Sequence, residues 1–141
     1  MKGNVSKMME YLLSRRQLGL LLGASGMALF GFSVCANDRL FPDVLAVKIR
    51  AVSDDTFDFD VTVSSTYDRP SRYADGFRVV TQQGALLGAR KLWHDHQGEQ
   101  PFTRDLHGVK VPKNLRVVVV QARDQVNGYG GKAIVAALPG R

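Results

Sequence analysis

Cysteine is nearly absent from this chain of 141 residues, and internal repeats and low-complexity segments are missing. The single cysteine, Cys35, excludes an internal disulfide framework, and no Cys-x-x-Cys or Cys/His spacing predicts a structural zinc module. A hydrophobic content of 45% is too high for a disordered chain. Length and composition therefore predict one globular domain with room for an appendage.

Sequence patterns of common catalytic chemistry are also missing. No Gly-x-Ser-x-Gly nucleophile elbow occurs, and Ser64-Ser65 has no histidine near it in the sequence. Gly128-Tyr129-Gly130 is not followed by a helix pattern that would hold a phosphate. No continuous basic stripe is interleaved with aromatic residues, which argues against a nucleic-acid partner. These absences favour a non-enzymatic protein and leave a small hydrolytic enzyme as the last alternative.

The first 36 residues have the pattern of a targeting segment. A positively charged region comes first, with Lys2, Lys7, Arg15 and Arg16. An uncharged apolar run follows from residue 18 and ends on Val34-Cys35-Ala36, so we expect a signal peptidase to cut after Ala36. This divides the chain into a signal peptide (1–36), a short linker (37–43) and a domain (44–141).

Paired arginines stand at the start of the apolar run. Ser14-Arg15-Arg16-Gln17-Leu18 resembles the twin-arginine (Tat) export signal, and glycines at four positions keep the run only mildly hydrophobic. The resemblance implies that the Tat machinery recognises Arg15 and Arg16, and that the folded protein reaches the periplasm. A mature domain without cysteine can finish folding in a reducing cytosol.

Two other interpretations of the same segment stay open. The apolar run is long enough to span a bilayer as an uncleaved anchor, which would then be the protein's contact with the membrane. Cys35 is a candidate for lipidation, but Phe32-Ser33-Val34 lacks the small residue that usually precedes a lipoprotein cysteine. Cleavage after Ala36 would leave a net charge of +3, compared with +6 for the whole chain.

After residue 43 the hydrophobic pattern has a period of two, which is typical of strands with one buried face. The first strand has its apolar face at Leu45, Val47, Ile49 and Ala51. After a turn at residues 53–55, the second has its apolar face at Phe57, Phe59, Val61 and Val63. The two strands are expected to pair, with opposite charges on the wet side of the sheet. Lys48 and Arg50 would face Asp58 and Asp60.

Further strands are expected at residues 77–81, 86–93, 102–106, 115–123 and 132–138. Gly108 is expected to end the third of these. Val117–Val120 is apolar on both faces, which predicts a strand buried between two layers. About seven short strands with frequent turns and no amphipathic helix predict an all-β fold, a single two-sheet antiparallel sandwich.

The last predicted hairpin combines an alternating strand that ends in Ala122-x-Asp124 with a glycine-rich turn at residues 127–131. It resembles the final hairpin of immunoglobulin-like and fibronectin-III-like domains. The resemblance implies that fold and no activity, and the missing Cys…Trp…Cys core excludes an antibody-type domain. Taken whole, the chain resembles small exported proteins of the bacterial periplasm.

One polar cluster, Trp93–Gln100, carries candidate metal chemistry. His94 and His96 are two residues apart, so in an extended strand both imidazoles leave the same face and can share one ion. His107 would supply a third nitrogen if the strand at 102–106 folds back, and Glu99 or Asp95 could complete the site or orient a ring. Three imidazoles would suit copper or zinc.

The alternative is a solvated loop, which Gly98 and Pro101 indicate for the same stretch. Trp93 is expected to pack in the core or at its edge, because large aromatic side chains are mostly buried. Its other candidate role is an anchor in a binding surface. Loops at the ends of a sandwich can also form a recognition patch, with the candidate residues Tyr67, Tyr73 and Tyr129.

The sequence thus favours a non-enzymatic binding or accessory module that recognises a periplasmic protein through its loops or a sheet edge. The alternative is a periplasmic copper- or zinc-binding protein that uses His94, His96 and His107.

Overall fold

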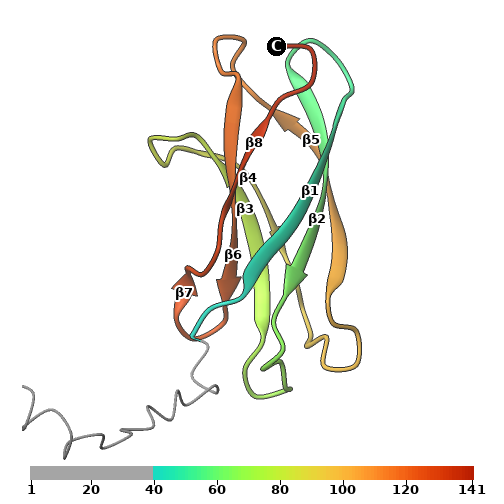
Figure 1. Cartoon of the computed structure of the whole chain (residues 1–141), viewed down its shortest axis with the longest axis vertical. Coiled ribbons are helices and arrows are strands. Elements are labelled where there is room, and N and C mark those ends of the chain that lie inside the picture. Colours follow the sequence, from blue (N-terminus) through green and yellow to red (C-terminus); the bar gives the residue numbers. More distant parts are fainter. Residues whose placement is uncertain (1–39) are drawn as a thin grey trace, which may run out of the picture. The chain divides into compact units, whose positions relative to one another are not determined.

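The computed structural model describes residues 40–141, in which every regular element is a β-strand (Figure 1). Eight strands follow one another: β1 (Asp43–Ala51), β2 (Thr56–Ser64), β3 (Ala74–Val80), β4 (Leu86–Lys91), β5 (Phe102–Lys110), β6 (Val117–Asp124), β7 (Gly128–Tyr129) and β8 (Ile134–Ala137). The predicted all-β class is therefore confirmed. Within residues 40–141, no helical segment reaches the length and hydrophobicity that crossing a bilayer requires.

The predictions for the targeting segment lie outside the described residues. They concern the signal at residues 1–36, the arginine pair Arg15 and Arg16, Cys35, and cleavage after Ala36.

The strands form two antiparallel sheets that face each other (Figure 1). One sheet has the order β1-β2-β5. In the other, β3 lies between β4 and β6, and both β7 and β8 pair with β6. The chain crosses between the sheets after β2, after β4 and after β5, as expected for a sandwich rather than a set of separate hairpins.

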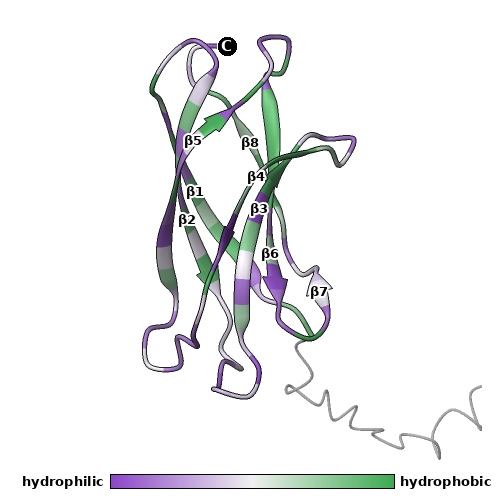
Figure 2. Cartoon of the chain, turned by 180° about the vertical axis from the view of Figure 1, so that it is seen from behind, coloured by the Kyte–Doolittle hydropathy of each residue, from purple (hydrophilic) through white to green (hydrophobic). Residues whose placement is uncertain are grey.

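The core lies between the sheets because each strand alternates between an inward and an outward side chain. The predicted inner face of β2 is confirmed, since Phe57, Phe59, Val61 and Val63 are all buried. From the facing sheet, β6 contributes Val118, Val120 and Ala122 to the same cluster. Figure 2 shows hydrophobic stretches along the strands and mostly hydrophilic loops at the two ends.

The predicted charge pairs on the outer face of β1 and β2 are also confirmed. Lys48 lies opposite Asp60 and Arg50 lies opposite Asp58, with 3.7 Å between the Arg50 and Asp58 side chains. Exposed pairs of this kind stabilise a sheet by only about 0.2–1 kcal/mol each. Their main effect is that the outer face of the sheet is polar and stays in contact with solvent.

The predicted apolar face of the first strand is wrong at Leu45 and at Ala51, the last residue of β1, because both are exposed. The register of β1 against β2 shifts between Val44 and Ala46, which marks a β-bulge. Val44 takes the buried position, and Leu45 is left 45% exposed.

The predicted end of the fifth strand at Gly108 is wrong as well. Gly108 has a φ of 68° and lies inside β5, where the pairing with β2 shifts register between Phe57 and Phe59. Because glycine adopts this positive φ without a steric penalty, the strand absorbs the irregularity and continues to Lys110.

Burial of Val117–Val120 on both faces is confirmed for one face only. Val118 and Val120 point into the core and are fully buried. Val117 and Val119 are half-buried on the outer face, where Val119 lies between Val80 of β3 and Val135 of β8. The extra strand relative to the predicted seven is β7, which has only two residues.

Candidate functional site

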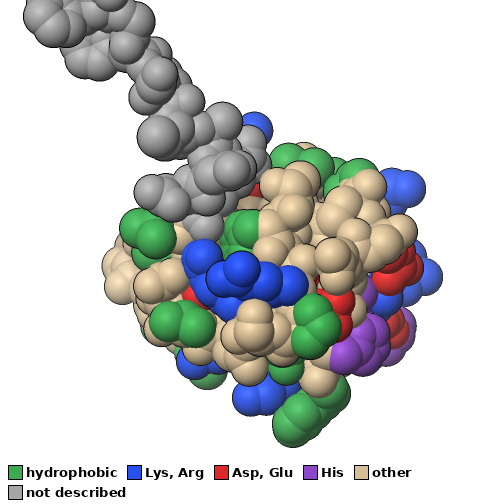
Figure 3. Space-filling model, turned by 90° about the horizontal axis from the view of Figure 1, so that it is seen from below, with side chains coloured by type: hydrophobic (Ala, Val, Ile, Leu, Met, Phe, Trp, Pro, Cys, Tyr) green, Lys and Arg blue, Asp and Glu red, His purple; other side chains and the backbone are tan. Residues whose placement is uncertain are grey.

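Three connections meet at one end of the sandwich: β2–β3, β4–β5 and the β6–β7 turn (Figure 1). Figure 3 looks at this end and shows histidine side chains together on one side, with acidic and basic side chains beside them. The β4–β5 connection, residues 92–101, carries most of the predicted site residues: Trp93, His94, Asp95, His96 and Glu99. It is a loop, as the alternative interpretation of Gly98 and Pro101 proposed.

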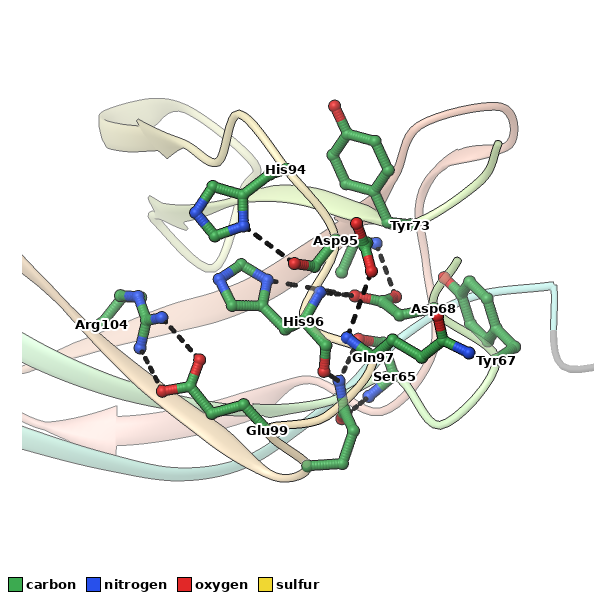
Figure 4. A network of polar contacts seen from close by, with 12 residues as sticks. Ser65, Tyr67, Asp68, Tyr73, His94, Asp95, His96, Gln97, Glu99 and Arg104 are labelled. Atoms are coloured by element: carbon green, nitrogen blue, oxygen red, sulfur yellow. Dashed lines mark hydrogen bonds and ion pairs between the residues drawn. The ribbon is translucent and has the colours of Figure 1, made fainter. Parts of the chain in front are cut away.

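Asp68 joins the β2–β3 connection to the β4–β5 connection (Figure 4). Its buried carboxylate accepts hydrogen bonds from the backbone N–H of Ala74 and from that of His96, each at 3.0 Å. A buried carboxylate that satisfies two backbone donors fixes both segments, because losing it would leave those donors unpaired. Asp68 therefore holds the backbone of His96 in place.

Gln100 makes a second link between the same two connections. Its side-chain oxygen accepts from the backbone N–H of Ser65 at 2.7 Å, and its amide nitrogen donates to the Ser65 hydroxyl and to the His96 carbonyl. Next to it, Glu99 forms an ion pair with Arg104 of β5 at 2.8 Å. The loop that carries the histidines is thus bonded to the β2–β3 connection through Gln100 and to β5 through Glu99.

The imidazole of His96 is buried, with 4% of the residue exposed. Its ring stacks on Phe102 with 3.9 Å between centroids and an angle of 12°. Nδ1 lies 4.0 Å from the Asp68 carboxylate and has no hydrogen-bond partner among residues 40–141. Burial lowers the pKa of His96, and the positive charge of Arg104 lowers it further, so the ring is neutral at neutral pH.

His94 lies over His96 at the surface. The two ring centroids are 4.8 Å apart and the rings are tilted by 37°. His94 Nδ1 lies 2.8 Å from the backbone carbonyl oxygen of Asp95, which leaves Nε2 as the ring atom directed away from the backbone. The two imidazoles are therefore in contact, in agreement with the prediction that their two-residue spacing brings them to one side. The segment that carries them is a loop, however, and not the extended strand on which that prediction was based.

His107 does not join the other two histidines. It lies on β5, where Nδ1 is 3.1 Å from Asp58 and Nε2 is 2.5 Å from Asp105, on the outer face of the β1-β2-β5 sheet. The hydrogen bond to Asp58 raises the pKa of His107, and the charge of Asp105 adds to the shift. Among residues 40–141, no group of three or more His, Cys, Asp or Glu side chains is arranged to hold a metal ion. The structure thus does not assemble the predicted three-histidine site.

Trp93 is not buried, contrary to the expectation that it packs in the core. It is 77% exposed, and the Lys91 ammonium lies 5.1 Å from its ring centroid. The Tyr73 hydroxyl donates to the Trp93 carbonyl oxygen at 3.3 Å, which ties its backbone to the β2–β3 connection. A small hollow of about 100 Å³ lies beside it, lined by Arg90, Lys91, Leu92, Trp93, His94, His96 and Arg104.

The other two candidate tyrosines make internal contacts. The Tyr67 hydroxyl donates to the buried carboxylate of Asp124 at 2.7 Å, and burial together with this bond raises the pKa of Tyr67 strongly. Tyr129 lies under the guanidinium of Arg78, 3.8 Å from its ring centroid. Both tyrosines therefore stabilise the end of the sandwich, while Tyr73 supports Trp93.

Sequence reasoning missed the residues that position this end, namely Asp68, Gln100, Arg104 and Asp124. The partners that join separate segments lie as far away as 57 positions along the chain, as for Asp124 and Tyr67, so no local pattern shows these links. One signal was present for Asp124, because it ends the alternating strand in Ala122-x-Asp124.

Comparison with known proteins finds one relative of note. A protein of Halomicrobium mukohataei with the printed name "Putative lipoprotein" is 38% identical to this chain over 93 residues, which are 66% of the chain and 45% of that protein. The chain therefore spans less than half the length of this relative. No family model matches the chain, and no solved structure matches it significantly.

Proposed function

We propose that this chain is an exported, non-enzymatic binding module that recognises a periplasmic protein through the end of the sandwich around Trp93. The single observation that carries the proposal is the exposure of Trp93, the only tryptophan of the chain. An exposed tryptophan keeps a large apolar surface in water, and this residue type is enriched among the anchors of protein interfaces.

The surroundings of Trp93 support this role. Its backbone is fixed by the Tyr73 hydroxyl, and the loop that carries it is held by Asp68 and Gln100. An anchor on a fixed backbone loses less conformational entropy on binding than one on a free loop. The basic side chain of Lys91 lies over the Trp93 ring and lines the adjoining hollow, which favours a partner with an acidic residue beside an apolar contact.

The order of the strands supports an immunoglobulin-like or fibronectin-III-like domain. The set β1-β2-β5 faces the set β4-β3-β6-β8, and the chain changes sheets three times along the way. Greek-key connections of this kind are typical of such sandwiches, in which end loops and sheet edges bind partners.

Two independent observations support export. The relative from Halomicrobium mukohataei bears a lipoprotein name, and a lipoprotein is a protein held at a membrane surface after export. The sequence of the targeting segment, with Arg15 and Arg16 before a mild apolar run, favours the Tat route and release into the periplasm after cleavage behind Ala36.

Site-specific photo-crosslinking in the exporting cell tests the binding surface. We expect a photo-reactive aromatic residue, which keeps a large ring at position 93, to capture one discrete protein partner. A matched control is position 86, because Leu86 is likewise exposed and apolar but lies at the opposite end of β4. Identical crosslinks from both positions, or none from position 93, would contradict the proposal.

A further inference from the structure

We propose that His94 and His96 together bind one Cu(II) ion through their Nε2 atoms at the surface of the β4–β5 connection. This site has two protein nitrogens and excludes His107, so it differs from the three-histidine site that the sequence indicated. It does not depend on a protein partner, and either proposal can fail without the other.

The first argument is the distance between the rings. A metal ion about 2 Å from an imidazole nitrogen lies roughly 3 Å from the ring centroid. Two centroids separated by 4.8 Å, as those of His94 and His96 are, can therefore share one ion without moving the backbone. In Figure 4 the rings lie one above the other, and the nitrogen that each leaves without a dashed contact points to the same side.

The second argument concerns the Nδ1 atoms, the ring nitrogens of His94 and His96 that would not bind the ion. Histidines that bind metals usually direct their second ring nitrogen at a carbonyl or carboxylate oxygen, which fixes the tautomer and the ring orientation. His94 Nδ1 is 2.8 Å from the Asp95 carbonyl oxygen. His96 Nδ1 lies 4.0 Å from the Asp68 carboxylate, which is too far for a hydrogen bond. The contact at His94 thus leaves Nε2 of that ring available, and Nε2 of His96 is the ring nitrogen that does not face Asp68.

The third argument is that His96 has little freedom to turn away. Its ring is stacked on Phe102, its backbone N–H is bonded to Asp68, and its carbonyl accepts from Gln100. This buried histidine is among the residues that line the hollow beside Trp93. A ligand held in this way loses little entropy when it coordinates an ion.

The donor set favours copper over zinc. Zinc sites in proteins use at least three protein ligands, whereas Cu(II) binds nitrogen donors more strongly than the other divalent ions of its row and accepts tetragonal sites completed by water. The nearby guanidinium of Arg104 is paired with Glu99 at 2.8 Å, and this carboxylate offsets part of its repulsion of a cation. One exposed and one buried imidazole beside the hollow are therefore a site for Cu(II) and a poor one for Zn(II).

The test is a titration of the protein, purified from exporting cells, with Cu(II) alone, followed by calorimetry and by electron paramagnetic resonance. We expect one Cu(II) per chain at micromolar concentrations, with hyperfine structure from two imidazole nitrogens, and weaker binding of Zn(II). His94→Ala removes one ligand at an exposed position and should weaken Cu(II) binding at least about tenfold without unfolding the domain.

His107→Ala is the matched control, because His107 is also exposed but lies on the other sheet between Asp58 and Asp105. It should leave the copper affinity and the spectrum unchanged. Absence of Cu(II) binding in the wild type, equal binding by His94→Ala, or equal loss in His107→Ala would each overturn the proposal. Circular dichroism of both variants shows whether a loss reflects the ligand or the fold.

Discussion

At the scale of single residues, the carboxylate of Asp124 joins the β2–β3 connection to the β6–β7 turn. It is fully buried and accepts hydrogen bonds from Tyr67, Arg72 and the backbone N–H of Asn127. Burial by itself would raise the pKa of Asp124, but the hydrogen bonds from Tyr67, Asn127 and Val126 outweigh it and hold the pKa below the usual value. The group is therefore ionised at neutral pH and is satisfied by its neighbours.

Replacing Asp124 should cost much of the stability of the domain. Asp124→Ala removes the acceptor of the Tyr67 hydroxyl and of the backbone N–H groups of Val126 and Asn127, so we expect the free energy of unfolding to fall by about 3 kcal/mol or more. Urea denaturation measures this. Asp54→Ala is the matched control, because the Asp54 side chain is 94% exposed, and a similar loss in both variants would contradict the role of Asp124.

A second residue-scale prediction concerns His107. Its pKa is raised in the folded state by the hydrogen bond to Asp58 and the charge of Asp105, from an ordinary value of 6.5. The stabilisation is therefore complete below the ordinary pKa and is lost as the pH rises through the higher folded pKa.

We expect the melting temperature of the wild type to exceed that of His107→Gln at about pH 5 and to approach it at about pH 9. Thermal unfolding of both proteins over this range checks the sign. A difference that grows with pH would show that the two carboxylates do not stabilise the charged imidazole.

At the scale of elements, the glycine turn between β6 and β8 is closed against the segment before β1. A Cβ atom on Gly131 would lie 2.1 Å from the Pro42 carbonyl oxygen, and its φ of 73° is in the left-handed region. Gly128 has a similar φ of 82°, but a Cβ there would meet nothing within 4 Å. A comparison of substitutions at the two glycines thus distinguishes the cost of backbone strain, which both positions share, from the cost of steric overlap, which occurs only at Gly131.

Gly131→Ala should therefore destabilise the domain more than Gly128→Ala. Left-handed strain alone costs roughly 1–2 kcal/mol for a residue with a side chain, and we expect Gly128→Ala to lose about that amount. Gly131→Ala must also move the backbone at Pro42, so its loss in urea denaturation should be clearly larger. Equal losses would mean that the close approach at Pro42 does not exist in solution.

The elements also show which features a sequence can predict. The inner face of β2 and its charge pairing with β1 follow from local alternation, because hydrophobic burial acts on every second residue of a strand. The bulge at Leu45 and the continuation of β5 through Gly108 depend on the partner strand, so no local pattern reveals them. Seven of the strands could thus be predicted from the sequence, whereas the register shifts in β1 and β5 could not.

The candidate site was predicted less completely than the fold. The two-residue spacing of His94 and His96 was a local signal, and the structure brings these rings together. The distance of His107 from the other two histidines depends on the tertiary structure, because β5 joins the sheet of β1 and β2. The exposure of Trp93 also depends on it, because the bond from the His96 backbone to Asp68 fixes the β4–β5 connection.

At the scale of the whole molecule, export by the Tat route predicts a dependence on the arginine pair. Arg15→Lys combined with Arg16→Lys keeps the charge, but it should leave the precursor in the cytoplasm because the Tat signal requires paired arginines. Cell fractionation measures this, and Lys2→Arg combined with Lys7→Arg is the matched control. Unchanged export of the first variant would indicate the general secretory route.

The mass of the exported protein distinguishes cleavage from anchoring. We expect a mature chain that begins at Asn37, because the predicted cut follows Ala36. A chain that begins with lipid-modified Cys35, or that keeps the whole targeting segment, would contradict cleavage behind Ala36 and place the domain at a membrane surface.

The most direct measurement of the central claim is the affinity of the partner captured through position 93, compared between the wild type, Trp93→Ala and Leu86→Ala. Because tryptophan anchors often contribute about 2 kcal/mol or more to an interface, we expect Trp93→Ala to weaken binding at least about tenfold. Leu86→Ala should bind like the wild type. Equal affinities of Trp93→Ala and the wild type would contradict a binding surface centred on Trp93.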